Sequence, residues 1–246
     1  MSDWPQIRKV GLSGLLVTFA GAMSEPANRA ALAFRATVEA EGWPEVMETS
    51  TSLVSAYLEM DLSAINVAEM IERLQTILDR QDWCTAPLPE GRTRWHVPTL
   101  YGTELAPQLE EAAALAGVDP DTAIAELSQA RVRVLTIGFA PGQPYTGELP
   151  AHWNIPRQKG LTKAVPPSSL VTAIRQLIVF TNAAPTGWRH VGQTAFRNFR
   201  SDAAEPFTLS PGDELTFPAV SRAAFDRLLA QPDGGMGGAE REALTS

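Results

Sequence analysis

Residues 131–157, RVRVLTIGFAPGQPYTGELPAHWNIPR, hold the side chains best suited to chemistry in this chain. A run of β-branched and apolar residues leads into GFAPGQPY at 138–145, where two prolines, two glycines and two aromatics cannot continue a strand. We therefore expect a rigid, exposed loop at a strand end, with aromatic faces and backbone N–H groups that can hold a ligand or a partner. The structural alternative is a stiff turn that closes a barrel corner.

The histidines and glycines add little further catalytic signal. His96, His152 and His190 do not pair at metal-ligand spacing, and no HExxH, CxxC or GxSxG motif is present, so we expect no metal site and no serine hydrolase. Strand alternation places His190 on the same face as Trp188, where a structural role is the commoner one. The segment GLSG at 11–14 lacks the Walker lysine. If the protein uses ATP, a partner chain is expected to supply much of its binding.

Several short motifs occur in a characteristic order. GFAPGQPYTGELP with a following PR is preceded by VPTLYG at 97–102 and PQLE at 107–110, and followed by GW at 187–188, GQT at 192–194 and SPGD at 210–213. Together they resemble the signature of the allophanate hydrolase subunit 1 family, over roughly residues 7–229. That family includes the B subunit of bacterial 5-oxoprolinase, KipI-type inhibitors of sporulation kinases and a carboxyltransferase subdomain of urea carboxylase.

The resemblance implies a groove on these motifs. Arg157 would bind a carboxylate or phosphate in bidentate fashion and Gln176 would orient an amide, which makes them the predicted catalytic residues. Each residue of the groove also has a structural alternative: core packing for the rings, a surface charge for Arg157 and a strand amide for Gln176. The predicted substrate- or partner-binding residues are Phe139, Pro141, Gly142, Tyr145, Trp188 and His190.

The chain departs from the family pattern within this groove. The family reads GIAGGQTGIYP where this chain reads VTAIRQLIVFT at 171–181, so Ile174 and Arg175 occupy two adjoining glycine positions. Gln193 stands for the arginine of GRT, Gln143 replaces the third aromatic of the loop, and Arg157 alone survives from a basic stretch. An anion site built from several arginines would be weakened by these changes. We therefore expect a divergent member of the family.

The elements that position these residues fall into two parts. The first, residues 1–83, is predicted to hold a strand at 12–19, a helix after Ser24, a hairpin of strands at 45–48 and 53–60, and a helix with the capping-box spacing of Asn66 and Glu69. This order predicts a small, sandwich-like α+β layer with helices on one side of an antiparallel sheet.

A linker at residues 84–93 leads to the second part, residues 94–229. We expect a helical insert over 107–127 and strands at 170–173, 177–180, 188–191 and 214–217, spaced as in a closed or nearly closed barrel. The resemblance implies a cyclophilin-like β-barrel, and the overall class is α+β. Residues 230–246 contain four glycines and little to bury, which predicts a disordered tail.

The composition of the chain limits the classes of partner that it can bind. The chain has 246 residues, 44% of them hydrophobic, and a formal net charge of −8 without a basic cluster, so we expect no nucleic acid partner. Cys84 is the single cysteine and cannot form an internal disulfide. No apolar stretch approaches the length of a membrane span and the N-terminus lacks a signal peptide, which predicts a cytoplasmic protein.

The leading hypothesis is subunit 1 (B) of a heteromeric, ATP-dependent amidohydrolase of the 5-oxoprolinase or allophanate hydrolase type. It would act on a small cyclic amide or ureido acid in a site shared with a larger subunit 2 (C), with ATP bound largely by that partner. The alternative is a KipI-like regulator that binds a sensor kinase through an apolar surface of Ile174, Leu177 and Ile178, and burial of these residues would remove that argument. A biotin-dependent carboxyltransferase fragment has no supporting lysine motif.

Overall fold

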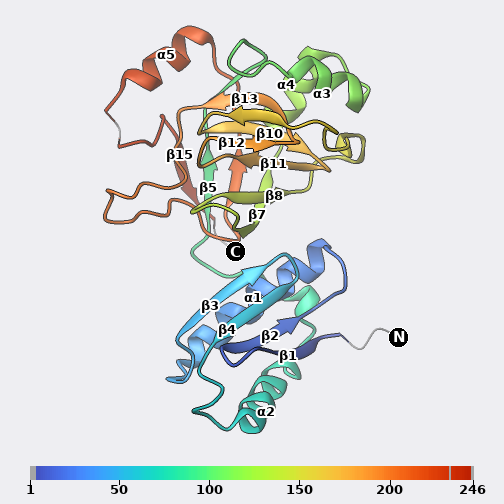
Figure 1. The fold of residues 1–246 in the computed structure, drawn as a ribbon, viewed down its shortest axis with the longest axis vertical. Coiled ribbons are helices and arrows are strands. Elements are labelled where there is room, and N and C mark those ends of the chain that lie inside the picture. Colours follow the sequence, from blue (N-terminus) through green and yellow to red (C-terminus); the bar gives the residue numbers. More distant parts are fainter. Residues whose placement is uncertain (1–3, 233, 245–246) are drawn as a thin grey trace. The chain divides into compact units, whose positions relative to one another are not determined.

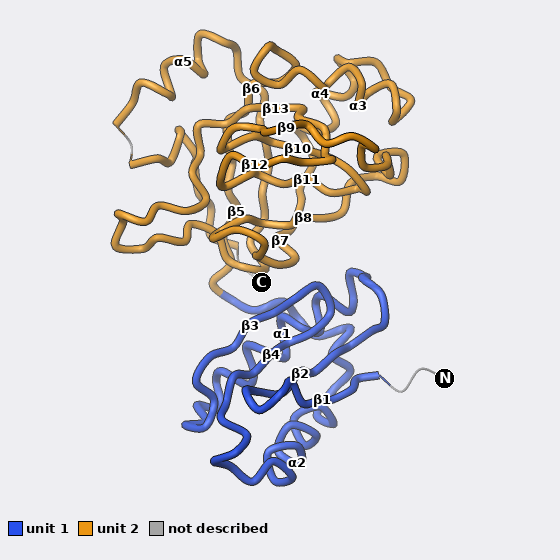
Figure 2. The backbone as a smooth tube through the Cα atoms, in the orientation of Figure 1, with its two compact units in different colours: residues 1–90, 245–246 blue, residues 91–244 orange. Residues whose placement is uncertain are grey.

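The computed structural model describes residues 4–232 and 234–244, which divide into two compact units (Figure 2). One unit extends to Glu90 and the other covers Gly91–Leu244. The division falls in the segment 84–93 that the sequence marks as a linker. Residues 1–3 of the predicted first domain lie outside the described residues. No described helix combines the length and the apolar character that crossing a membrane requires.

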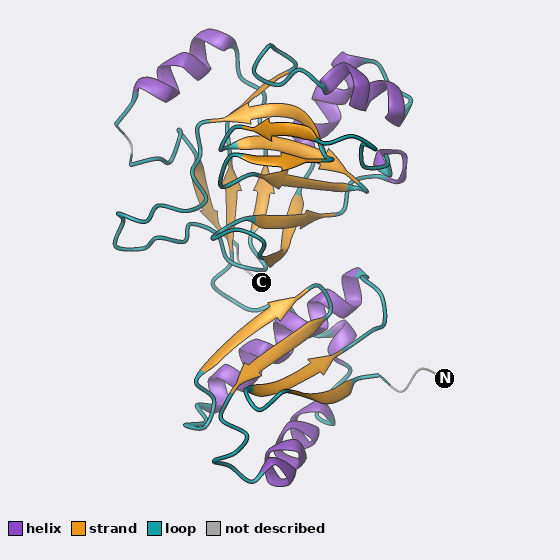
Figure 3. Ribbon diagram, viewed as in Figure 1, coloured by secondary structure: helices purple, strands orange, loops and turns teal. Residues whose placement is uncertain are grey.

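The first unit is a four-stranded antiparallel sheet covered by helices (Figures 1 and 3). Its strands have the order β1-β2-β4-β3, and one core joins residues of the sheet, both helices and the 3-10 helix η1. In chain order the elements are β1 (Gln6–Val10), β2 (Gly14–Thr18), α1 (Glu25–Glu41), β3 (Glu48–Ser52), β4 (Ser55–Glu59), α2 (Val67–Leu78) and η1 (Trp83–Thr85).

The two helices begin at the capping residues predicted from the sequence. The Ser24 hydroxyl accepts a hydrogen bond from the N–H of Ala27 at 3.4 Å, and Asn66 Oδ1 accepts one from Glu69 at 3.3 Å. The predicted strand boundaries were less accurate. The strand expected at 12–19 is the second half of a β1–β2 hairpin, and the strand expected at 45–48 lies at Glu48–Ser52, because exposed edge strands such as β1 and β3 show little apolar patterning.

The second unit contains three sheets and three α-helices within the described residues. A four-stranded sheet has the order β11-β10-β13-β6, a five-stranded sheet the order β15-β5-β14-β7-β8, and β12 and β9 form a two-stranded sheet. Its elements are β5 (Thr93–His96), β6 (Thr99–Tyr101), α3 (Leu109–Ala116), α4 (Pro120–Gln129), β7 (Val132–Ile137), β8 (Pro144–Gly147), η2 (Ala151–Trp153), β9 (Thr162–Val165), β10 (Ser169–Ala173), β11 (Gln176–Val179), β12 (Ala184–Thr186), β13 (Arg189–Thr194), β14 (Glu214–Thr216), α5 (Arg222–Ala230) and β15 (Glu240–Ala243).

The mixed α and β class is confirmed, whereas a closed barrel is not. The two larger sheets share one core, to which the four-stranded sheet contributes Leu170 and Val191 and the five-stranded sheet contributes Trp95 and Leu215. The strands β8 and β11 remain edge strands of separate sheets. Among the described hydrogen bonds, the one that joins these two strands comes from a side chain: the hydroxyl of residue 146 donates to the carbonyl of residue 177 at 2.5 Å. The helical insert is present as α3 and α4.

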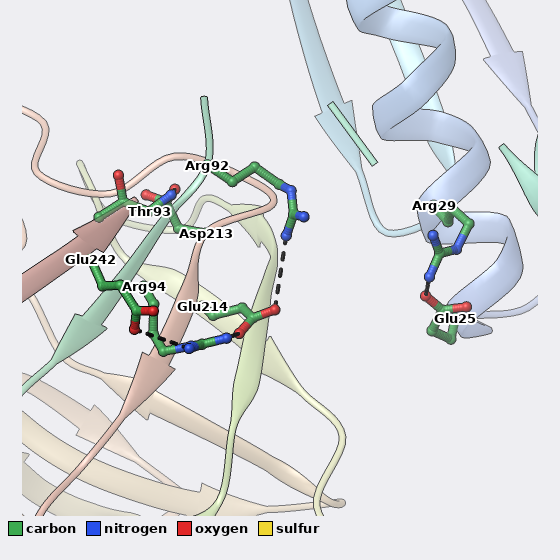
Figure 4. Close-up of polar contacts among 8 residues, drawn as sticks. All are labelled: Glu25, Arg29, Arg92, Thr93, Arg94, Asp213, Glu214 and Glu242. Atoms are coloured by element: carbon green, nitrogen blue, oxygen red, sulfur yellow. Dashed lines mark hydrogen bonds and ion pairs between the residues drawn. The ribbon is translucent and has the colours of Figure 1, made fainter. Parts of the chain in front are cut away.

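The prediction of a disordered tail over residues 230–246 is wrong for residues 240–243, which form strand β15. Strand β15 pairs antiparallel with β5, and Glu242 accepts a hydrogen bond from Arg94 at 3.0 Å (Figure 4). Gly237 has φ 59° and a Cβ there would lie 2.3 Å from the backbone carbon of Ala195, so glycine is needed for this close approach. Residues 233 and 245–246 of the predicted tail lie outside the described residues.

Candidate functional site

The loop at residues 138–143 joins β7 to β8 and is held by its own backbone. The N–H of Gly138 donates to the carbonyl of Gln143, and the N–H of Gln143 donates to the carbonyl of Ala140, both at 3.1 Å. Phe139 has φ 69° and is 79% exposed, and Pro141 is also exposed. A Cβ on residue 142 would lie 2.9 Å from the carbonyl oxygen of residue 198, so Gly142 packs against that backbone.

The other two aromatic residues of the predicted groove belong to a small apolar cluster. Trp188 is buried with Val171 and Ile178 on one side of the four-stranded sheet, and Tyr145 packs against this cluster. The Arg157 guanidinium carbon lies 5.8 Å from the centroid of the Trp188 ring, within the range of a cation–π contact. Arg157 is exposed and therefore lies over the cluster from the solvent side.

Gln176 begins β11, directly after the two-residue turn of the β10–β11 hairpin. Its carbonyl accepts a hydrogen bond from the Thr172 hydroxyl at 3.0 Å, and its side chain is half-buried. Ile174 and Arg175 both have positive φ, 45° and 63°, which such a turn requires and which favours glycine. Arg175 offsets this with a hydrogen bond from Nε to the carbonyl of Leu149 at 2.8 Å and an ion pair with the carboxylate of residue 148.

We predict that Ile174→Gly stabilises the second unit by about 1 kcal/mol. A β-branched residue at positive φ destabilises the fold by about 1–3 kcal/mol, and glycine removes this strain. The greater conformational entropy of glycine in the unfolded state costs about 0.5–1 kcal/mol of the gain. Little burial is lost, because the Ile174 side chain is 46% exposed. Urea unfolding of both proteins measures the difference. Arg175→Gly is the matched control and should not stabilise, because it also removes the contacts to residues 148 and 149. A loss of stability in Ile174→Gly would contradict the strain argument.

Two adjoining cavities lie beside β13 in the second unit, and Val165 of the Trp188 cluster lines one of them. One of about 580 Å³, called the arginine cavity, is lined by Arg197, Arg200, residues of α5, residues 231–232 and glycines 234, 235 and 237. The other, of about 410 Å³, is here called the histidine cavity and is lined by His190 together with Glu104, Gln108 and Thr162. Leu105 and Pro166 line both.

A β-bulge in the β10–β13 ladder brings His190 and Gln193 to the same face of the sheet. The ladder pairs Ser169 with Gln193 and Val171 with His190, so two steps on β10 face three steps on β13. Residues two apart on β10 share a face, and their partners on β13 therefore share it too. Because of the bulge, β13 contributes a lining residue to each cavity from the same face, His190 to the histidine cavity and Gln193 to the arginine cavity.

Gln193 is fixed by its neighbours. Its Nε2 donates to the carbonyls of Pro167 and Thr194 at 3.0 and 3.1 Å, and its Oε1 accepts from the Ser169 hydroxyl at 3.2 Å. The amide therefore ties the segment 166–169 to β13. Gln193 stands at the position where the resembled family has arginine. It lines the arginine cavity without adding a charge, so the positive charges of this cavity come from other side chains.

His190 is a polar residue of the histidine cavity, and its ring nitrogen Nε2 has unused hydrogen-bonding capacity. It is 4% exposed, and its Nε2 is buried without a hydrogen-bond partner among the described residues. Gln108 holds its backbone on both sides, because Gln108 Oε1 accepts from the His190 N–H and the Gln108 N–H donates to the His190 carbonyl, both at 3.0 Å. Burial lowers the pKa of His190, so the imidazole is neutral near pH 7. A neutral imidazole in this place can form a hydrogen bond with a small polar molecule.

The lowered pKa of His190 predicts a loss of stability in mild acid. The folded pKa lies below the ordinary value of 6.5, so the stabilising contribution is complete above that pH and is lost as the pH falls through the folded pKa. The slope can reach about 1.4 kcal/mol per pH unit for one proton. Urea unfolding between pH 8 and pH 5 should show a steeper loss in the wild type than in His190→Gln. Parallel curves would contradict the prediction.

Of the eight residues predicted for the site, only His190 lines either cavity. The structure brings three of the others together at the small apolar cluster, namely Trp188, Tyr145 and Arg157, and places Phe139, Pro141 and Gly142 in the loop before β8. Sequence reasoning did not single out Gln108, Arg197 and Arg200, which line the two cavities. The repeat of arginine in FRNFR, soon after the GQT motif, was the signal that could have identified the last two. Across residues 4–232 and 234–244, no group of three or more His, Cys, Asp or Glu side chains could hold a metal ion.

Comparison with known proteins gives consistent results. Residues 5–209 match the family described as the carboxyltransferase domain, subdomain C and D. The B subunit of the 5-oxoprolinase of Bacillus subtilis is 25% identical over 223 residues, which cover 88% of this chain and 93% of that protein. The B subunit of the 5-oxoprolinase of Escherichia coli O157:H7 is 33% identical over 149 residues, 61% of this chain and 66% of that one.

The fold is also found among solved structures. The structure of TTHA0988 superimposes with a TM-score of 0.70 at 24% sequence identity. The match covers 88% of this chain and 40% of the TTHA0988 chain, so this chain corresponds to less than half of that larger protein. This similarity concerns the fold alone.

Proposed function

This chain belongs to the family of the carboxyltransferase domain, subdomain C and D, and on that premise we propose that it is the B-type subunit of a 5-oxoprolinase-type complex. The observation that carries the proposal is the match to the B subunit of the Bacillus subtilis 5-oxoprolinase, which extends over 88% of this chain and 93% of that protein. The reaction proposed for the complex is the ATP-dependent opening of an amide bond in a small cyclic amide or ureido acid.

The histidine cavity is the part of this chain proposed to contact the amide. His190 offers a neutral imidazole whose Nε2 lacks a partner among the described residues, and Glu104, Gln108 and Thr162 supply further polar groups beside the apolar surface of Pro166. A cyclic amide presents one donor, one acceptor and an apolar ring edge, which suits such a lining. The role of His190 would be to hold and orient the amide.

Arg157 and Gln176 stay as predicted catalytic residues, in a second location. They lie outside both cavities, near the apolar cluster of Trp188 and in the β10–β11 hairpin. If the shared site with subunit 2 includes this surface, Arg157→Ala and Gln176→Ala will impair the complex. If it is confined to the histidine cavity, both variants will be fully active.

ATP is assigned mainly to the partner chain. A phosphate-binding loop places glycines between a strand and a following helix, so that backbone N–H groups surround the phosphates. In this chain the described glycine-rich segment at 234–238 instead follows α5 and precedes β15. The partner would supply the nucleotide and part of the catalytic groups, and this chain would supply the amide contact.

The regulatory alternative has lost most of its basis. It required Ile174, Leu177 and Ile178 to form an outward apolar surface, but Leu177 is 0% and Ile178 is 1% exposed. Only Ile174, at 46%, faces solvent at the hairpin turn. Of the three residues proposed for a kinase-binding surface, a single one is therefore available.

Identification of the partner tests the proposal. The chain would be tagged at its own locus, purified under mild conditions, and its co-purifying proteins identified by mass spectrometry. A stoichiometric larger subunit would support the composite enzyme. A sensor kinase in its place, or a chain that purifies alone under all conditions, would contradict it.

A further inference from the structure

The arginine cavity contains two guanidinium groups that the described carboxylates do not neutralise. Arg197 and Arg200 both line it, three residues apart on the segment that leaves β13. The cavity also contains Asp202, but no ion pair within 4.0 Å joins any described acid to either arginine. By contrast, Arg189 on the preceding strand is paired with Glu111 at 2.9 Å.

Arg200 has unused donors in a partly buried position. Its Nε is buried without a hydrogen-bond partner among the described residues. Its two terminal nitrogens donate only to the carbonyls of Gly234 and Glu205, at 3.4 and 3.5 Å, where hydrogen bonds are weak. Carbonyl oxygens carry no net charge, so no hydrogen bond among the described residues pairs this guanidinium with a carboxylate. A guanidinium in this state favours an oxyanion, which it can bind through two parallel N–H groups.

Arg197 supplies the second positive charge. Its side chain is exposed, with its backbone N–H donating to the carbonyl of Gly235 at 2.8 Å. A Cβ at Gly235 would lie 3.0 Å from Arg197 Cδ, so the close approach of the glycine-containing segment holds the stem of this arginine in place. The chain has a formal net charge of −8, so two arginines on one short segment form a local positively charged site on a negatively charged protein.

The remaining walls suit the organic part of a small ligand. Phe225, Leu228 and Leu229 of α5 and the prolines at 166 and 167 provide apolar surface. A volume of about 580 Å³ falls within the range of ordinary small-molecule sites, which is about 300–1,000 Å³. An apolar wall facing a pair of guanidiniums fits a small molecule with an anionic end.

We propose that the arginine cavity binds the oxyanion of a small organic acid or phosphate ester, with Arg200 and Arg197 as its ligands. The identification of this acid as the substrate rests on the proposed function. A carboxylate bound in the arginine cavity would lie next to the histidine cavity, because Leu105 and Pro166 line both. Carboxylate and phosphate share this chemistry. The acid would be the substrate itself, whereas a phosphate ester would be the nucleotide.

Calorimetric titration of the purified full chain, without any partner, tests the site. The probes are 5-oxoproline, its uncharged carboxamide and inorganic phosphate. We expect at least one of the two anions to bind, with affinity lowered at least 10-fold in Arg200→Gln and in Arg197→Gln. Arg227→Gln, which removes an exposed arginine of α5 that does not line the cavity, should bind like the wild type.

The pattern of binding decides the source. Binding of 5-oxoproline but not of its carboxamide supports a substrate carboxylate, and binding of phosphate alone supports a nucleotide. Arg200→Lys keeps one charge and should retain part of the affinity, and equal melting temperatures of the variants exclude unfolding as the cause. Absence of binding by both anions, or unchanged affinity in both glutamine variants, would overturn the site. Because no partner is present, these outcomes are independent of whether the complex forms or turns over.

Discussion

Replacing His190 by leucine in the assembled complex is expected to lower kcat/KM about 10- to 100-fold. The Nε2 of His190 is buried and has no partner among the described residues, so the substrate amide would provide its hydrogen bond. Leaving a buried amide unpaired costs about 1–3 kcal/mol, which gives this range of rate loss. Leucine has a similar volume and no hydrogen-bonding atom. Steady-state kinetics of the complex with the cyclic amide and ATP measures the effect.

Two controls separate this role from a structural one. His190→Gln retains a donor and an acceptor and should recover part of the activity lost in the leucine variant. Arg157→Ala and Gln176→Ala test the groove predicted from the sequence, which would give the larger loss if chemistry occurred there. Unchanged kcat/KM in His190→Leu, together with large losses in these two variants, would move the site from the histidine cavity to that groove.

Replacing Trp153 by alanine is expected to destabilise the second unit by about 3–5 kcal/mol. Trp153 is 0% exposed and belongs to the core shared by the two larger sheets. Its indole N–H donates to Glu126 Oε2 at 2.7 Å, and its carbonyl accepts the N–H of Arg175 at 3.1 Å, so η2, α4 and the β10–β11 turn meet here. Truncation of a buried tryptophan leaves a large cavity, which accounts for the magnitude. Urea unfolding measures the change.

Trp153→Phe is the matched control for the ring. It keeps most of the apolar volume and loses the hydrogen bond to Glu126, so a smaller loss of about 1–3 kcal/mol is expected. An alanine variant with a stability within about 1 kcal/mol of the wild type would show that the segment 151–153 is not part of the core, contrary to the packing of Trp153.

Local sequence signals predicted the capped helices and several strands of the second unit. The caps at Ser24, Asn66 and Asp119 start helices where expected, because a side-chain acceptor satisfies a backbone donor within a few residues of itself. The strands around 170, 177, 189 and 214 follow from short apolar runs between turn residues. These are features that a chain encodes within ten residues.

Features that depend on distant pairing could not be predicted in this way. The glycines of the tail suggested disorder, yet they allow residues 234–238 to pass close to 195–197 before β15 joins β5. Barrel closure depends on whether β8 and β11 form a ladder, which neither strand reveals alone. The bulge opposite Leu170 and Val171 decides which residues of β13 share a face, and it places His190 beside a cavity on the face that carries Val171 of the Trp188 cluster.

The most direct test of the composite-enzyme proposal is the turnover of 5-oxoproline with ATP by the purified chain alone, by its larger partner alone and by the two together. We expect product only from the mixture, because the histidine cavity of this chain is proposed to hold the amide and the partner is proposed to bring ATP. Turnover by this chain alone would contradict the composite-enzyme proposal, as would a mixture that forms a stable complex and hydrolyses none of the cyclic amides and ureido acids offered.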